Sequence, residues 1–150
     1  MKMSLKTAAL AALFASLCAI TAQARDTAHV LPVKSALETS EAKAKLDGDI
    51  RFYFGNQPHS AVEARLTKGV VSNKRTNAAN KSAAEACNHV ILSALISLQE
   101  RARKEGGNAV INIESYFKKK TFRSNDQFEC YVGSIMAAVT LKGDVVKLKR

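Results

Sequence analysis

The stretch Lys104–Ile113, KEGGNAVINI, joins a helical pattern to a strand pattern through a pair of glycines. Before it, Ser82–Glu105 gathers apolar residues on one face of a helix, the pattern of a helix that packs on a sheet. After it, Ala109, Ile111 and Ile113 alternate along a strand. A phosphate-binding loop has the reverse order, with the strand before the helix. The glycines are therefore expected to end the helix at a corner, where glycine takes the left-handed conformation at low cost.

The remaining patterns predict short elements around this helix and strand. Ser35–Leu46 favours a short helix, and the alternation in Asp49–Phe54 favours a half-buried strand. Cys130–Leu141 is apolar on both faces, which is typical of a central strand. Irregular structure is expected at 25–33, 73–80 and 118–127, strands at 62–71 and 145–149, and a turn at 143–144. The fold class is therefore α+β: one long helix packed on a mainly antiparallel sheet, in a single small domain.

The first residues predict a signal peptide. Lys2 and Lys6 precede an apolar run over 8–20, and a small–x–small site ends at Ala24. That run is shorter than the roughly 20 residues that a helix needs to cross a bilayer. Leu17 before Cys18 disfavours lipidation, which requires a small residue there. We therefore expect a signal peptide at 1–24 and one periplasmic domain at 25–150, with no membrane-spanning segment after cleavage. The alternative is a retained membrane anchor.

Charge and cysteines add two expectations. The 150-residue chain has a net charge of +10, which favours association with polyanions. After removal of residues 1–24, Cys87 and Cys130 remain. An even pair in an exported protein is most simply a disulfide, which would give the domain its one covalent link. A catalytic thiol or a metal ligand is the alternative, but two isolated cysteines cannot make a four-ligand zinc site alone.

The residue types of enzyme sites are scattered along the chain. Its three histidines, His29, His59 and His89, stand apart, and their spacing suggests no Ser/His/Asp constellation. The acidic residues form no close pair in an expected pocket. We therefore expect a non-enzymatic protein without catalytic residues, a metal site or a cofactor.

The far side of the long helix is the first candidate binding surface. Leu92 and Ile96 fall opposite the face that should pack on the sheet. Either the N-terminal segment folds over them or a partner protein docks there.

A basic segment is the second candidate. Tyr116–Arg123, YFKKKTFR, interleaves three aromatic residues with four cations, and is expected to lie on a hairpin. The cations are Lys118, Lys119, Lys120 and Arg123. Such a surface suits lipopolysaccharide, anionic lipid or nucleic-acid phosphates, of which nucleic acid is the least expected in the periplasm. The alternative is a solvated hairpin whose lysines protect a sheet edge from aggregation.

Several motifs carry a resemblance that spans nearly the whole expected domain. They are FYFGNQ (Phe52–Gln57), AEAC (Ala84–Cys87), SALISLQERA (Ser93–Ala102), GGNAVINIESYFK (Gly106–Lys118), EC (Glu129–Cys130) and VTLKG (Val139–Gly143). In these the chain resembles a family of small exported proteobacterial proteins often labelled "excinuclease ATPase subunit". The chain has no Walker motif and no paired zinc-binding cysteines, so the resemblance implies a fold and a compartment but not that ATPase.

The helix–GxNAV–strand core is also similar to that of the Rcs envelope-stress sensor lipoprotein. That resemblance implies that Cys87 and Cys130 tie the helix to the sheet. The functional expectation is a non-enzymatic periplasmic binding or adaptor protein, with a possible link to envelope stress. The alternative is a binder of anionic envelope polymers such as lipopolysaccharide through the basic hairpin.

Overall fold

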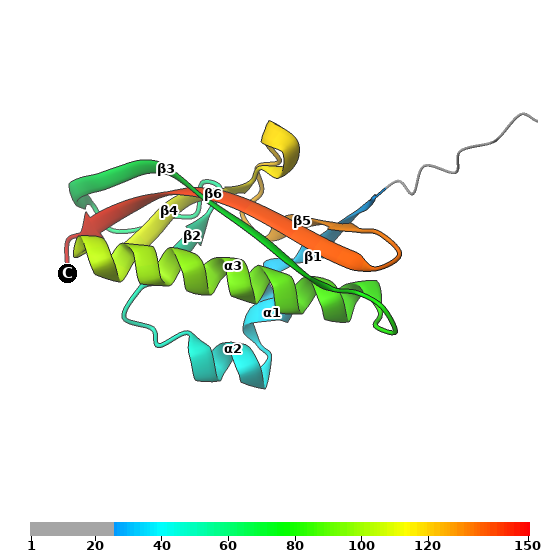
Figure 1. The fold of residues 1–150 in the computed structure, drawn as a ribbon. Coiled ribbons are helices and arrows are strands. Elements are labelled where there is room, and N and C mark those ends of the chain that lie inside the picture. The colour runs from blue at the N-terminus through cyan, green and yellow to red at the C-terminus, as the bar shows by residue number, and fades with distance from the viewer. Residues whose placement is uncertain (1–25) are drawn as a thin grey trace, which may run out of the picture.

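A computed structural model describes residues 26–150, and the expected signal peptide lies outside the described residues. The strands are β1 (Thr27–Pro32), β2 (Arg51–Phe54), β3 (Val62–Asn77), β4 (Ala109–Ser115), β5 (Gln127–Val132) and β6 (Met136–Leu148). The helices are α1 (Val33–Leu37), α2 (Ser40–Lys45), the long α3 (Ala83–Glu105) and a single 3-10 turn, η1 (Phe117–Lys119). The predicted fold class is confirmed: α3 packs on a mostly antiparallel sheet in one small domain (Figure 1).

All six strands form one sheet around β6. The order is β1-β5-β6-β4-β2, and β3 pairs with the other side of β6 along its length. β4 pairs with the second half of β6 and β5 with its first half, so these two strands follow one another along the same edge. Every pairing is antiparallel except that of β2 with β4. The prediction of a central strand within Cys130–Leu141 is therefore confirmed for β6, which pairs with β3 on one side and with β4 and β5 on the other.

Local signals set both ends of α3. The Ser82 hydroxyl accepts a hydrogen bond from the Glu85 backbone N–H over 3.1 Å, which satisfies a free donor of the first turn. Gly106 ends the helix in the left-handed conformation with φ 78°. The expected corner at the glycine pair is thus confirmed. The apolar face of α3 is buried against the sheet, and the Cys87–Cys130 disulfide joins the helix to β5.

The N-terminal helices form a third layer. Instead of one helix over Ser35–Leu46, the chain makes the two short helices α1 and α2, separated at Glu38 and Thr39. The Thr39 hydroxyl caps α2 by accepting from the Ala42 N–H over 3.1 Å. Both helices lie beside α3 on the side away from the sheet (Figure 1).

Four predictions of local structure along the strands are wrong. Residues 27–32 form β1, and the polar run 73–77 belongs to β3, because an edge strand can leave one face in solvent. The expected strand Cys130–Leu141 is interrupted by a turn between β5 and β6. The expected turn at Gly143 is instead part of β6. Glycine is needed there because a Cβ would lie only 2.8 Å from Val110 Cγ1 of the neighbouring strand.

The two faces of the sheet differ in cover. The face toward α3 holds the main core, with Val139, Leu141 and Val145 of β6 fully buried. The opposite face, here called the outer face, carries a smaller apolar cluster that includes Val146 and Leu148, and beside it a group of polar side chains. Among residues 26–150, no helix is long and apolar enough to cross a membrane.

Candidate functional site

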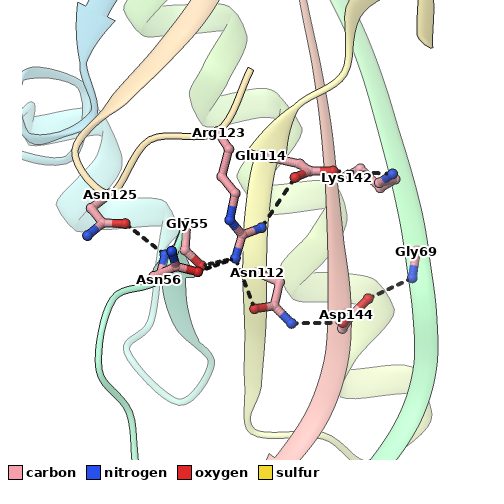
Figure 2. A network of polar contacts seen from close by, with 9 residues as sticks. All are labelled: Gly55, Asn56, Gly69, Asn112, Glu114, Arg123, Asn125, Lys142 and Asp144. Atoms are coloured by element: carbon pink, nitrogen blue, oxygen red, sulfur yellow. Dashed lines mark hydrogen bonds and ion pairs between the residues drawn. The ribbon is translucent and has the colours of Figure 1, made fainter. Parts of the chain in front are cut away.

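A network of polar side chains on the outer face connects β3, β4, β6 and the β2–β3 turn (Figure 2). Asp144 of β6 is buried, with 8% of its surface exposed. Its Oδ1 accepts from the Gly69 N–H over 2.8 Å, and its Oδ2 accepts from Asn112 Nδ2 over 3.0 Å. Arg65 of β3 adds an ion pair at 3.5 Å. Asp144 thus links three neighbouring strands through one carboxylate.

Asn112 occupies an unusual backbone position in this network. Its φ is 55°, in the left-handed region that asparagine tolerates better than most residues. The register of β4 against β6 shifts between Ile111 and Glu114, so Asn112 lies in a β-bulge. The bulge places Asn112 and Glu114 together on the outer face, where both reach the side chains of β6.

Arg123 belongs to this network and not to the lysine group with which it was predicted. Its guanidinium donates to the Gly55 carbonyl and to Asn56 Oδ1, each over 2.7 Å. It also lies 3.3 Å from Glu114, which receives Lys142 Nζ at 3.2 Å on its other oxygen. Because its guanidinium is already bound by these acceptors, Arg123 links the loop before β5 to the β2–β3 turn.

The network borders a small open pocket of about 330 Å³. Its lining is polar and made of Lys68, Asn112, Glu114, Arg123, Lys142, Gly143 and Asp144. Both acids in it accept hydrogen bonds or ion pairs from neighbouring side chains. The arrangement fits a structural role, in which buried polar groups are satisfied and hold the bulge in place.

The three lysines lie on a separate element, here called the basic turn (Phe117–Lys120). The expected hairpin is reduced to one antiparallel bridge between Ser115 of β4 and Phe122, because β5 pairs with β1 and β6 and not with β4. The chain between them forms η1, which projects from the sheet away from α3 (Figure 1). Lys118, Lys119 and Lys120 are all exposed, and none forms an ion pair within residues 26–150.

The basic turn is held in one shape by its aromatic residue. Phe117 stacks on Tyr131 of β5 with ring centroids 3.8 Å apart, and only 8% of Phe117 is exposed. Lys118 and Lys119 both have left-handed backbones, with φ 49° and 63°. The Lys120 N–H closes the turn on the Phe117 carbonyl over 3.0 Å. The lysines are therefore presented from a fixed base.

Strand register brings one further cation toward the basic turn. Arg75 of β3 lies opposite Ala138 of β6, and Ala138 lies opposite Tyr131. Directly opposed residues share a face of the sheet, so Arg75 is about two strand spacings, roughly 10 Å, from the ring under Phe117. Arg75 is exposed and has no ion pair in the described chain. The sequence offers Arg75 as one of several cations outside Tyr116–Arg123 that could add to its positive field, and only strand pairing shows that it lies near the basic turn.

The other predicted candidate, the far side of α3, is covered. Leu92 is 2% exposed and Ile96 is half-buried. Hydrogen bonds attach α1 and α2 on both sides of them: Ser35 to Asn88 over 3.3 Å, and Gln99 Nε2 to the Lys45 carbonyl over 3.1 Å. Of the two alternatives, the N-terminal segment folds over these residues, and Leu92 is not open to a partner.

The three histidines lie on separate elements. His29 is in β1, His59 lies beside the Tyr53 ring at 5.4 Å, and His89 Nδ1 is 3.4 Å from Glu41. In the part of the chain that the structure describes, no group of three or more His, Cys, Asp or Glu side chains is placed to hold a metal ion.

No protein-family model, no curated protein and no solved structure matches the chain. Its function is therefore argued from its own residues.

Proposed function

We propose that this protein is a non-enzymatic binding protein of the periplasm that holds anionic envelope polymers, with lipopolysaccharide as the first ligand to test, through the basic turn. The observation that carries the proposal is the set of three consecutive exposed lysines, Lys118–Lys120, on a turn fixed by the Phe117–Tyr131 stack. Arg75 adds a fourth cation on the same side of the sheet.

The physical basis is simple electrostatics. A basic segment near an anionic surface gains about 1 kcal/mol for each lysine or arginine, and the gain disappears within a Debye length of about 10 Å at 0.1 M salt. Three lysines therefore contribute about 3 kcal/mol, or a factor of roughly 100 in affinity. The net charge of +10 attracts a polyanion over longer distances and raises its encounter rate.

The export expected from the N-terminal sequence supports this choice of ligand, since phosphorylated polymers of the envelope would be the polyanions within reach. An adaptor that docks an envelope protein on Leu92 and Ile96 is less well supported, because Leu92 is buried beneath the N-terminal helices. A link to envelope stress stays a prediction from the resemblance.

The test compares two triple variants in a binding assay with vesicles that contain lipopolysaccharide. The first carries Lys118→Glu, Lys119→Glu and Lys120→Glu. The matched control carries Lys43→Glu, Lys81→Glu and Lys149→Glu, which are exposed lysines without ion pairs in residues 26–150. Both change the net charge equally, so long-range attraction falls alike in the two.

We expect the first variant to bind at least about 100-fold more weakly than wild type, and the control to lose much less. Binding of the wild type should weaken steeply as salt rises, because phosphate contacts release counterions. Equal losses in the two variants would show that net charge alone acts, and undiminished binding by the first variant would refute the proposal.

A further inference from the structure

Three strands of the sheet lie at its edges: β1, β2 and β3. An edge strand has unpaired N–H and C=O groups, which can pair with another chain unless charges, bulges or short length prevent it. β2 has four residues and a register shift against β4. β3 has three register shifts against β6 and carries cations such as Lys68 and Lys74. Both edges are thus protected in the usual ways.

β1 has neither a charged side chain nor a bulge, and the proline at its end, Pro32, is its one protection. Its six residues, Thr27–Pro32, read TAHVLP and include no Asp, Glu, Lys or Arg. Each of the six pairs with a residue of β5 without a register shift, so the strand is regular. Val30, opposite Glu129 on the outer face, is 45% exposed. β1 is therefore a regular, uncharged and partly apolar edge.

More exposed apolar surface lies near the start of β1. Thr27 pairs with Val132, the last residue of β5; the turn after it carries Ile135, and Met136 begins β6. These two residues are 64% and 44% exposed. Val30, Ile135 and Met136 thus make up three of the five large exposed hydrophobic residues among residues 26–150. Isolated exposed apolar residues are common, and Ile135 and Met136 neighbour Ala78 and Asn77. The case for an interface therefore rests on the regular, uncharged edge and on Val30.

We propose that β1 pairs antiparallel with β1 of a second copy of this chain, so that two sheets join across a two-fold axis. A two-fold axis perpendicular to a sheet sets a strand against its own copy in the antiparallel sense. With a net charge of +10, most surfaces of two copies repel one another. The basic edge β3 would bring like charges together, whereas the neutral β1 brings none, so β1 is the edge where self-association costs least.

The interface is small. A six-residue strand is about 20 Å long, and the pairing buries little beyond the two copies of Val30 and their neighbours. We therefore expect a weak dimer, with a dissociation constant in the micromolar range or above, at the low end of interface sizes. Its salt dependence should be the opposite of polymer binding: screening reduces repulsion between the copies, so the dimer strengthens as salt rises.

Sedimentation equilibrium of the purified full-chain product, over a wide range of concentration, gives the first test. The wild type should pass from monomer to dimer, and Val30→Lys should raise the dissociation constant at least tenfold, since it sets two lysines near the two-fold axis. Val71→Lys is the matched control, because Val71 is 50% exposed on the outer face but belongs to β3. A wild type that stays monomeric, or a Val30→Lys dimer as tight as wild type, would overturn the proposal.

Cross-linking gives a second test that does not depend on affinity. Cys87 and Cys130 are paired, so Val30→Cys adds the only free thiol among residues 26–150. A short bismaleimide should join two Val30→Cys chains and leave Val71→Cys chains single. Equal cross-linking of the two variants, or cross-linking of Val30→Cys to a different envelope protein in cells, would refute self-pairing. Neither result bears on the basic turn, so the two proposals fail separately.

Discussion

Asn112 donates a hydrogen bond from Nδ2 to Oδ2 of Asp144 over 3.0 Å, and so joins a left-handed bulge in β4 to a buried carboxylate in β6. The two residues support one another. The bulge aims the amide at the carboxylate, and the hydrogen bond offsets part of the backbone strain that asparagine accepts there.

The backbone and side-chain contributions of Asn112 are separable. Asn112→Gly keeps access to φ 55° but loses both side-chain hydrogen bonds, whereas Asn112→Ala also strains the backbone. We expect both variants to be destabilised, and the alanine variant by about 1 kcal/mol more than the glycine variant. Urea unfolding measures the difference. An alanine variant as stable as the glycine variant would contradict the strained bulge.

Asp144 should be more sensitive to substitution than an exposed acid of the same sheet. Both carboxylate oxygens of Asp144 accept hydrogen bonds, one from the Gly69 N–H and one from Asn112 Nδ2. Asp144→Asn replaces one of these oxygens by an NH2 group, which sets donor against donor and leaves a buried hydrogen bond unmade. The expected loss in free energy of unfolding is about 1–3 kcal/mol. Glu63→Gln on β3, at an exposed site, should change it by less than about 0.5 kcal/mol. Similar losses in the two variants would argue against the network's contribution.

Thr140 carries a buried hydroxyl on the outer face that has no hydrogen-bond partner among residues 26–150. Thr140→Val keeps the shape and removes the polar atom, so stability should be unchanged or rise by up to about 1 kcal/mol. Ser115→Ala is the contrasting change, because the Ser115 hydroxyl accepts from the Glu129 N–H over 2.9 Å. Thermal unfolding should show a loss for Ser115→Ala, and a comparable loss for Thr140→Val would prove the expectation wrong.

Acid should destabilise the fold through surface carboxylates. The hydrogen bond from Lys45 lowers the pKa of Glu41, that from Arg103 lowers the pKa of Asp49, and those from Thr67 and then Arg101 lower the pKa of Glu105. In that range the unfolded chain binds more protons, so stability rises with pH. The contribution is fully present above the ordinary pKa values, the highest being 4.5, and is lost as pH falls through the lowered values.

Urea midpoints measured above and below this range would test the acid dependence. Arg103→Gln frees Asp49, so its loss of stability on acidification should be shallower than that of wild type. A wild-type midpoint that does not change with acidification would contradict the linkage.

The disulfide should contribute strongly to the stability of so small a domain. Cys87 and Cys130 are 43 residues apart in sequence, and closing a loop of that length stabilises the fold by up to about 4 kcal/mol through unfolded-chain entropy. The double variant Cys87→Ala, Cys130→Ala should lose most of that amount in denaturant unfolding. Wild type under reducing conditions serves as a second measurement of the same loss, and an unchanged midpoint in both would contradict the entropic contribution.

Several features were predictable because neighbouring residues specify them. Ser82 and Gly106 mark the ends of α3, and the apolar stripe between them specifies the face that packs on the sheet. The alternation at Phe52 and Phe54 predicted β2. The Cys87–Cys130 pairing followed from an even count in an expected exported domain and from the resemblance.

The bulge at Asn112, the contact of Asp144 with Gly69 and the burial of Leu92 depend on segments far apart in sequence. An asparagine inside a strand pattern, and a Gly-Asp pair inside another, were the only local signs of the network. They resemble turn signals, which is why Gly143 was assigned to a turn.

The sequence by itself determined the long helix, the α+β class and the presence of a basic segment, since each depends on residue spacing within one stretch of chain. Only the tertiary structure decided what those residues face. Pairing across the sheet moved Arg123 from the basic segment into a structural network, brought Arg75 toward the lysines and left β1 as an uncharged edge. These relationships arise from strand register, which contacts between distant segments determine.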